Sequence, residues 1–264
     1  MKTLFAATLT GAALLSGAAL AADLPAPAPM PYKAPAAVAP VYNWTGCYVA
    51  GGFGYGVWNQ DNWPETFPGL VLVGGSSRVT NGGRGWMGLA GGGCDVEVPV
   101  GFFGNVVFGA FADYDFMDIH GAATLFAGIG GEQKQRDAWA AGARVGVAVT
   151  PNLLAYSNGG FTQSHFNGVT LQISPGAGAL VGSTPAHTFN GWFLGGGTEY
   201  ALNFSWLPIH GLFWRNEYRF SSFGKADLPI TPAPGSAFPA GFGSHQQYYE
   251  QQVLSELVWR FNWQ

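Results

Sequence analysis

The adjacent residues Ser164 and His165 are the pair in this chain whose types could support covalent chemistry. A serine hydroxyl beside an imidazole suits nucleophilic acyl transfer, provided that a carboxylate orients the imidazole. The sequence identifies no carboxylate for that role. We therefore expect no catalytic residue, and an enzyme that uses this pair is the least favoured functional hypothesis.

The glycine clusters and the histidines of the chain do not have the spacing of a cofactor site or a metal site. The clusters Gly52-x-Gly54 and Gly91-x-Gly93 lack the third glycine of a dinucleotide-binding loop, and no strand-to-helix turn follows them. Five histidines lack the chain spacing of metal ligands, namely His120, His165, His187, His210 and His245. We expect neither a cofactor nor a bound metal.

Charged side chains in the last third of the chain alternate with apolar ones at a period of two. Between residues 212 and 220, Arg215, Glu217 and Arg219 share one parity. The other parity carries the large residues Leu212, Trp214, Tyr218 and Phe220. Successive side chains of a β-strand point to opposite faces. Such a segment therefore has one charged face and one apolar face.

The same separation recurs in other segments, and the acids and bases on the charged faces nearly cancel. We predict that they point into a common interior and form a paired polar network, made of Asp113, Asp115, Arg144, Glu199, Arg215, Glu217, Arg219, Glu256 and Arg260. Arg84 and Asp137 break the parity and are expected at strand tips. The segment around Asp95 is ambiguous.

The overall composition favours strands. The chain of 264 residues has 11 Lys and Arg against 15 Asp and Glu, a net charge of −4. Only 10% of its residues are charged, whereas soluble domains have about 25%. Glycine, with 41 residues, and an aromatic content of 15% take the place of the charges. This composition argues against coiled coils and against basic nucleic-acid binders, so we expect no nucleic-acid partner.

Segments with a period of two recur from Trp44 onward, and their connections alternate in length. Long connections of about 20 to 25 residues alternate with short ones of about 3 to 8, as in an up-and-down barrel. The eight predicted strands are 46–58, 84–98, 104–117, 138–149, 153–166, 188–202, 211–223 and 246–263.

These patterns predict an all-β fold, an eight-stranded antiparallel up-and-down transmembrane β-barrel. A charge that faces lipid near the bilayer centre costs about 2 to 4 kcal/mol, whereas an inward charge can pair. Side chains roughly fill the interior of a barrel of eight strands. Aromatic residues near strand ends are expected in two interfacial girdles on the outer wall, namely Trp44, Tyr48, Trp58, Trp139, Trp192, Trp214, Trp259 and Trp263.

The amino-terminal region reads as an export signal and a leader. Lys2, an apolar stretch and the small residues around Ala21 predict a cleaved signal peptide over 1–21. A Pro/Ala-rich periplasmic leader is expected over 22–43, and the barrel domain over 44–264.

Several motifs of the chain resemble those of the OmpA-like, porin-family outer-membrane β-barrel proteins, which include the outer-membrane immunogenic proteins. The motifs are YNWTGCYVAGG at 42–52, GCD at 93–95, VFGAFADYD at 107–115, GGGTEYAL at 195–202 and EYRF at 217–220. The resemblance covers essentially the whole mature chain. It implies an eight-stranded barrel in the outer membrane of Gram-negative cells.

The resemblance also bears on the cysteines and the carboxyl terminus. A hairpin brings Cys47 and Cys94 to one level at its periplasmic end, and in the family register both point outward, so we expect a disulfide rather than two free thiols. Family chains commonly end on an aromatic residue that the barrel-assembly machinery reads. Phe261 and Trp263 are the expected assembly signal, although Gln264 follows them.

Three functions are consistent with these features. The leading hypothesis is a non-enzymatic, surface-exposed antigen that contributes to envelope integrity and contacts outer-membrane lipid and lipopolysaccharide, with a host or environmental ligand at its loops. The second is a narrow porin-like diffusion channel. The third is an outer-membrane lipid-modifying enzyme, for which Ser164 and His165 would be the reacting pair.

Overall fold

The computed structural model describes residues 42–66, 71–72, 78–101, 104–126, 128–173, 178–204 and 210–261. The predicted signal peptide, nearly all of the predicted leader and Trp263 lie outside these described residues. Within the described ranges, no helix has the length and hydropathy that a membrane span requires.

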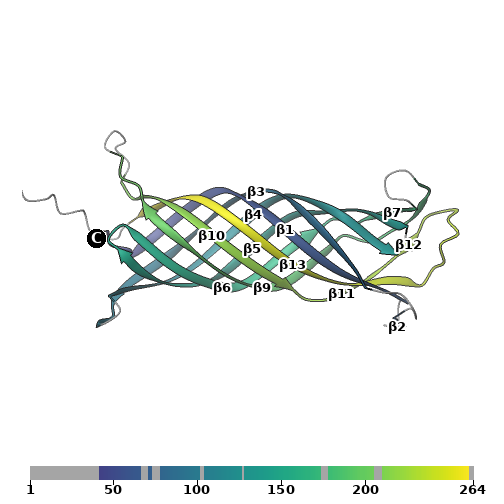
Figure 1. The fold of residues 1–264 in the computed structure, drawn as a ribbon, viewed down its shortest axis with the longest axis horizontal. Helices are drawn as coiled ribbons and strands as arrows, with labels where there is room; N and C mark the ends of the chain where they lie inside the picture. The colour runs from purple at the N-terminus through teal and green to yellow at the C-terminus, as the bar shows by residue number, and fades with distance from the viewer. Residues whose placement is uncertain are drawn as a thin grey trace, which may run out of the picture. The chain divides into compact units, whose positions relative to one another are not determined.

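Eight long antiparallel strands among the described residues close into a barrel (Figure 1). Each strand pairs with the next in the order given below, and the last pairs with the first. The predicted fold class is therefore confirmed. The strands are β1 (Gly46–Thr66), β3 (Val79–Pro99), β4 (Asn105–Phe126), β5 (Ile129–Thr150), β6 (Leu153–Phe166), β9 (His187–Ala201), β10 (Leu212–Phe223) and β13 (Phe242–Phe261).

The two ends of the barrel differ in their connections. Short turns join the strands at the periplasmic end, such as residues 151–152 between β5 and β6. Gly211 has a φ of 79° in the turn before β10, and its carbonyl accepts the backbone N–H of Arg260 at 2.8 Å. The opposite end carries five short strands (Figure 1), namely β2 (Val71–Leu72), β7 (Thr170–Ile173), β8 (Leu180–Ser183), β11 (Ala226–Pro229) and β12 (Thr231–Pro232).

Five strands extend further from the membrane than the sequence predicted. Strand β1 continues to Thr66 and β4 to Phe126, while β3, β5 and β13 begin earlier than expected. The predicted strands ended where polar residues follow the apolar run on the outer face, as with Asn59 and Asp61. Beyond the membrane a strand has no lipid to face, so its outer side chains become polar although backbone pairing continues.

Aromatic side chains surround the outer wall at two levels. The girdle nearer the end with the five short strands, which we call the upper girdle, receives one residue from each long strand. It consists of Tyr55, Trp86, Phe116, Trp139, Phe161, Trp192, Phe220 and Tyr249. The lower girdle consists of Tyr200, Trp214, Trp259 and Phe261. From Trp259 to Tyr249 the chain advances 259 − 249 = 10 residues, which at about 3.3 Å per residue and a tilt of about 40° spans about 25 Å.

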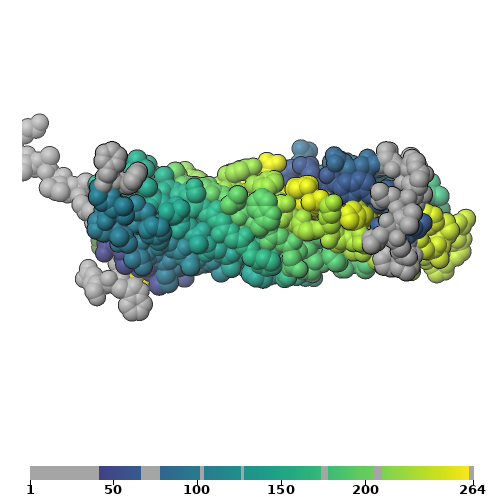
Figure 2. Space-filling view, turned by 90° about the horizontal axis from the view of Figure 1, so that it is seen from below, coloured from purple at the N-terminus to yellow at the C-terminus, as the bar shows by residue number. Residues whose placement is uncertain are grey.

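That spacing matches the apolar band of an outer-membrane barrel. Exposed apolar side chains such as Phe53, Leu194 and Val253 occupy the wall between the girdles. Figure 2 shows one side of this wall, where neighbouring strands form a continuous surface. We call the strand segments beyond the upper girdle, with the five short strands, the outer extension.

Side chains fill the lumen at successive levels. An apolar cluster around Tyr48, Leu154 and Val258 lies toward the periplasmic end. A second cluster around Trp58, Ile119 and Tyr248 fills the middle. A third cluster, which includes Leu171 and Ile230, lies in the outer extension.

Candidate functional site

Strand register brings the charged residues of the lumen together. Arg215 of β10 lies directly opposite Glu199 of β9 on one side and Glu256 of β13 on the other. All nine residues of the predicted network point inward, and most are nearly inaccessible to solvent. The lumen is therefore the candidate functional site of this barrel.

Glu199 is the centre of one group of ion pairs. It accepts hydrogen bonds from three arginines: Nε of Arg260 at 2.6 Å, Nη2 of Arg215 at 2.9 Å and Nη1 of Arg144 at 3.2 Å. A carboxylate can accept about four hydrogen bonds, so a single Glu can serve three cations. Loss of Glu199 would remove a partner from all three arginines at once.

Asp95 completes this first group. It accepts from Nε of Arg144 at 2.9 Å and from Nη1 of Arg260 at 2.7 Å. The ambiguous parity of the second predicted strand is thus resolved, since Asp95 points inward and Cys94 outward.

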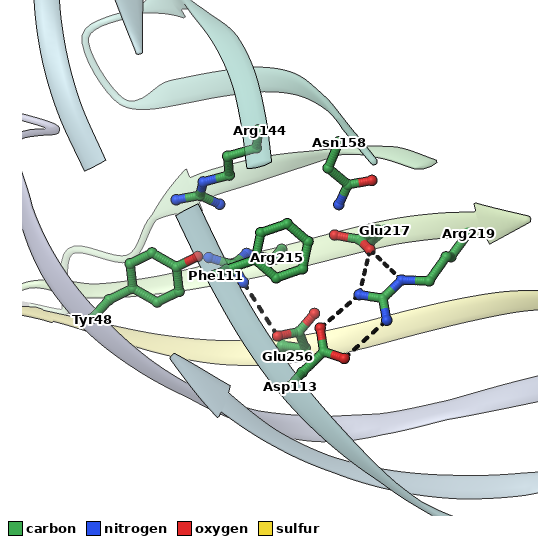
Figure 3. A pocket seen from close by; sticks show the side chains of 9 residues that line it. All are labelled: Tyr48, Phe111, Asp113, Arg144, Asn158, Arg215, Glu217, Arg219 and Glu256. Atoms are coloured by element: carbon green, nitrogen blue, oxygen red, sulfur yellow. Dashed lines mark hydrogen bonds and ion pairs between the residues drawn. The ribbon is translucent and has the colours of Figure 1, made fainter. Parts of the chain in front are cut away.

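Arg219 is the centre of a second group. Its Nη1 and Nη2 donate to the two oxygens of Asp113 at 3.0 and 2.8 Å, in a bidentate pair. Nε and Nη2 also donate to Oε1 of Glu217, at 3.0 and 2.9 Å. The hydroxyl of Tyr156 donates to Glu217 Oε2 at 2.7 Å. Figure 3 shows Arg219 between Asp113 and Glu217.

Aromatic rings line the guanidinium groups. The ring of Tyr48 lies 4.6 Å from the guanidinium carbon of Arg215 and 4.7 Å from that of Arg144. The ring of Phe193 lies 4.8 Å from that of Arg219. Such cation–π contacts stabilise the cations in a water-poor lumen.

The expected balance of charge inside the barrel is wrong. The described lumen holds seven carboxylates, because Asp95 and Glu250 join the five that were predicted, against four arginines. Glu250 is held by amides instead of a cation: Gln135 donates at 2.9 Å and Gln252 at 3.0 Å. The sequence showed Glu250 on the charged parity, which Gln252 shares, but Gln135 is 115 residues away and only the fold brings it close.

Little space remains between these groups. The residues in Figure 3 line a cavity of about 10 Å³, which is room for about one water molecule. A charged lumen this closely packed can hold the wall together, but it offers a solute almost no volume.

The predicted disulfide is present. Cys47 and Cys94 are directly opposed on β1 and β3, and their sulfur atoms are bonded. Both lie on the outer wall at the periplasmic end: Asp95 directly follows Cys94 on β3, and Arg260 lies on β13, which pairs with the strand of Cys47.

Three of the predicted girdle residues lie in the lumen instead. Trp44, Tyr48 and Trp58 are at most 3% exposed and pack within the apolar clusters. The membrane-spanning part of β1 carries no charge, so its parity could not be oriented from the sequence. Trp58 also needs a glycine opposite it, since a Cβ at Gly83 would lie 2.3 Å from its ring.

Four other predicted girdle residues lie on the outer wall. Trp192, Trp214 and Trp259 are about half exposed, and Trp139 packs beside Phe161 with ring centres 5.3 Å apart. Phe261, the described half of the predicted assembly signal, is the last residue of β13 and also faces outward.

Arg84 and Asp137 do not lie at strand tips as expected. They are inside β3 and β5, on the outer wall near the upper girdle. Asp137 has the outward parity of Trp139, two residues along β5, and its carboxylate contacts Nδ1 of His165; a register irregularity lies between Gln135 and Asp137. The two residues mark the level where the wall changes from apolar to polar.

Ser164 and His165 point to opposite faces of β6. Ser164 is buried in the lumen, where Gln135 Nε2 donates to its hydroxyl at 2.9 Å. His165 faces outward and contacts Asp137. The carboxylate that the sequence could not identify thus exists, but the wall of the barrel separates the serine from the imidazole.

Two curated proteins of the same name are similar to this chain in sequence. No family model matches the chain. The 31 kDa outer-membrane immunogenic protein of Brucella melitensis biotype 1 is 30% identical over 203 residues, which cover 73% of this chain and 77% of the relative. The protein of the same name from Brucella suis biovar 1 gives the same values.

Solved structures that match the chain include three outer-surface or outer-membrane proteins. Ail, the attachment invasion locus protein of Yersinia pestis, is 7% identical with a TM-score of 0.32, over 79% of this chain and 99% of its own. Neisserial surface protein A is 10% identical with a TM-score of 0.31, over 80% of this chain and 99% of its own. The outer membrane protease OmpT from Escherichia coli is 10% identical with a TM-score of 0.40, over 82% of this chain and 96% of its own.

Proposed function

Since this chain belongs to the family of the outer-membrane immunogenic proteins, we propose that it stabilises the envelope as a sealed barrel. In this proposal the protein is an outer-membrane β-barrel surface protein that catalyses no reaction and conducts no solute. Its outer extension serves as the surface for contact with lipopolysaccharide, a host or the environment.

The packed lumen is the observation that carries the proposal. Four buried arginines bridge carboxylates on five strands, and two cavities lined by residues of this network measure about 10 Å³ each. Apolar clusters lie on both sides of this network. Interactions that connect opposite walls favour a rigid body over a passage, which argues against the diffusion-channel hypothesis.

Cationic side chains on the outer wall support contact with lipopolysaccharide. Arg84, Lys134 and Arg136 lie on the outer wall at or beyond the upper girdle, and the side chain of Arg136 is 63% exposed. Phosphate groups of the outer leaflet lie at the level of an interfacial girdle, and arginine pairs well with phosphate. The assembly machinery is the remaining proposed partner, through Phe261 and Trp263.

Planar-bilayer recording tests the sealed lumen. The purified protein, inserted at single-molecule density, is expected to leave the membrane current at its baseline, with rare and brief openings at most. Stable stepwise conductance in most insertions would favour a diffusion channel. Folding of the protein that is added to the bilayer is verified independently by the heat-shifted electrophoretic band of a closed barrel.

A deletion strain tests the envelope role and the absence of an enzyme. Loss of the protein is expected to increase sensitivity to detergent and leave the mass spectrum of lipid A unchanged. A lipid A species that depends on the protein would contradict the non-enzymatic proposal.

A further inference from the structure

Three side chains with metal-binding chemistry converge on the outer extension. Glu65 of β1, Asp227 of β11 and His245 of β13 each offer a ligand atom, and these atoms lie within 4.8 Å of one another. Asp227 is directly opposite His245, and Glu65 is opposite Gly243, two residues from His245. The three strands are adjacent in the barrel, although the residues are far apart in the sequence. Chain spacing therefore gave no sign of the cluster.

The Glu65 carboxylate lacks a hydrogen-bond donor at one oxygen. Glu65 is 1% exposed, and its Oε1 has no hydrogen-bond partner among the residues that the structure describes. Asp227 Oδ1 instead contacts Nδ1 of His245. Burying a carboxylate oxygen without a donor is unfavourable, and a second carboxylate nearby adds repulsion. A cation bound between these groups would remove both penalties.

We propose that Glu65, Asp227 and His245 bind one divalent transition-metal ion of the zinc type. An imidazole nitrogen favours zinc over magnesium or calcium, while two carboxylates neutralise the charge of the ion. The side chains of His245 and Asp227 are 24% and 32% exposed, which leaves water access to a further coordination position. The ring of Trp63 packs 5.5 Å from that of His245 and restricts its orientation.

Neighbouring cations lie against other groups. Lys225 Nζ lies 5.7 Å from the ring centre of Trp63, and the guanidinium carbon of Arg78 lies 5.8 Å from it. Arg78 also pairs with Asp61 at 3.4 Å. The competing explanation for the cluster is therefore the imidazolium of His245 itself, bridging two carboxylates with no metal.

The chain contains a matched control for that explanation. His120 also lies between two carboxylates on the outer wall, with Nε2 at 3.0 Å from Asp118 and Nδ1 in contact with Glu132. The two carboxylates contact different ring nitrogens, on opposite sides of the imidazole, so their oxygens do not converge with one nitrogen on a single point. If any histidine flanked by carboxylates bound the ion, His120 would bind it too.

Zinc titration of the folded protein tests the proposal. The whole chain without a polyhistidine tag is folded in detergent micelles, treated with a chelator, dialysed and titrated with Zn²⁺ against a chromophoric competitor. We expect one saturable Zn²⁺ per chain. His245→Gln and Glu65→Gln should each weaken binding at least about tenfold, while His120→Gln should leave it unchanged.

Each outcome decides for or against the site. The heat-shifted band reports folding of every variant. If His245→Gln does not fold, the zinc affinity of Glu65→Gln tests the site instead. Visible absorption of bound Co²⁺ should appear in the wild type and disappear in the folded variants of the cluster. Absence of stoichiometric Zn²⁺ in the wild type, equal affinity in the cluster variants or an equal loss in His120→Gln would each overturn the proposal.

Discussion

Two groups of ion pairs in this barrel use the same kinds of side chain in opposite surroundings. In the lumen, Glu199 and the arginines it joins are at most 5% exposed. On the outer extension, the side chains of Asp118 and Glu132 are 72% and 68% exposed, and Lys134 approaches Asp118 at 2.6 Å. The distances are similar in both groups, so the geometry of the pairs does not distinguish them.

Burial decides what each group contributes. Water and salt screen the exposed pairs, whose contribution is about 0 to 1 kcal/mol each. Inside the lumen a charge that loses its partner cannot be solvated, so removing one partner costs about 3 to 5 kcal/mol. The buried ion pairs therefore hold the strands of the barrel together, whereas the exposed ion pairs give the outer extension its polar surface.

Glu199→Gln is the substitution with the largest expected effect on this comparison. The amide keeps the volume but loses the charge that faces three arginines. We expect the free energy of unfolding in lipid vesicles to fall by about 3 to 5 kcal/mol. Urea titration followed by tryptophan fluorescence measures it.

Glu132→Gln is the matched control in the exposed group. The same chemical change there should lower the free energy of unfolding by less than about 1 kcal/mol. Equal losses in the two variants would show that burial does not separate the groups.

Tyr156→Phe tests the buried group without changing a charge. The substitution removes only the hydroxyl that donates to Glu217 at 2.7 Å. Hydrogen bonds to charged groups contribute about 1.5 to 3 kcal/mol, and we expect a loss within that range. Tyr218→Phe, whose half-exposed hydroxyl donates to Gln251 at 3.0 Å on the outer wall, is the control and should change stability less. An equally large loss of stability in Tyr218→Phe would show that buried and exposed hydrogen bonds contribute alike.

The sequence predicted the fold well because the membrane imposes alternation. Where Arg215, Glu217 and Arg219 alternate with apolar residues, the charged face of the strand must avoid lipid. The parity of a residue therefore determines whether its side chain points into the lumen or toward lipid. That constraint ends at the upper girdle. The strand ends from Asn59 to Thr66 and from Asp118 to Phe126 were predicted as loops for this reason.

The candidate site was less predictable where no charge oriented a strand. In β1 both parities are apolar or glycine across the membrane, so Trp44, Tyr48 and Trp58 were assigned to the wrong face. Long-range partners were also beyond reach, as with Glu65 and His245, because their proximity follows from strand register. Residue types alone do not give that register.

The smallest expected effect concerns the pH dependence of the exposed group. Hydrogen bonds to Asp118 and then to Glu132 raise the pKa of His120, which lies beyond the membrane-spanning band. A group whose pKa is raised on folding stabilises the protein fully below its unfolded pKa, which for histidine is about 6.5. The stabilisation is then lost as the pH rises through the folded pKa.

His120→Gln should therefore reduce stability at pH 5.5 and have almost no effect at pH 9. Since the side chain of His120 is 42% exposed, the difference at low pH should be no more than a few tenths of a kcal/mol. It should also shrink in about 1 M salt, because the Debye length falls to about 3 Å. Urea titrations of both proteins at the two pH values measure it. A loss independent of pH and salt would mean that His120 acts by packing, and the exposed group would then resemble the buried one.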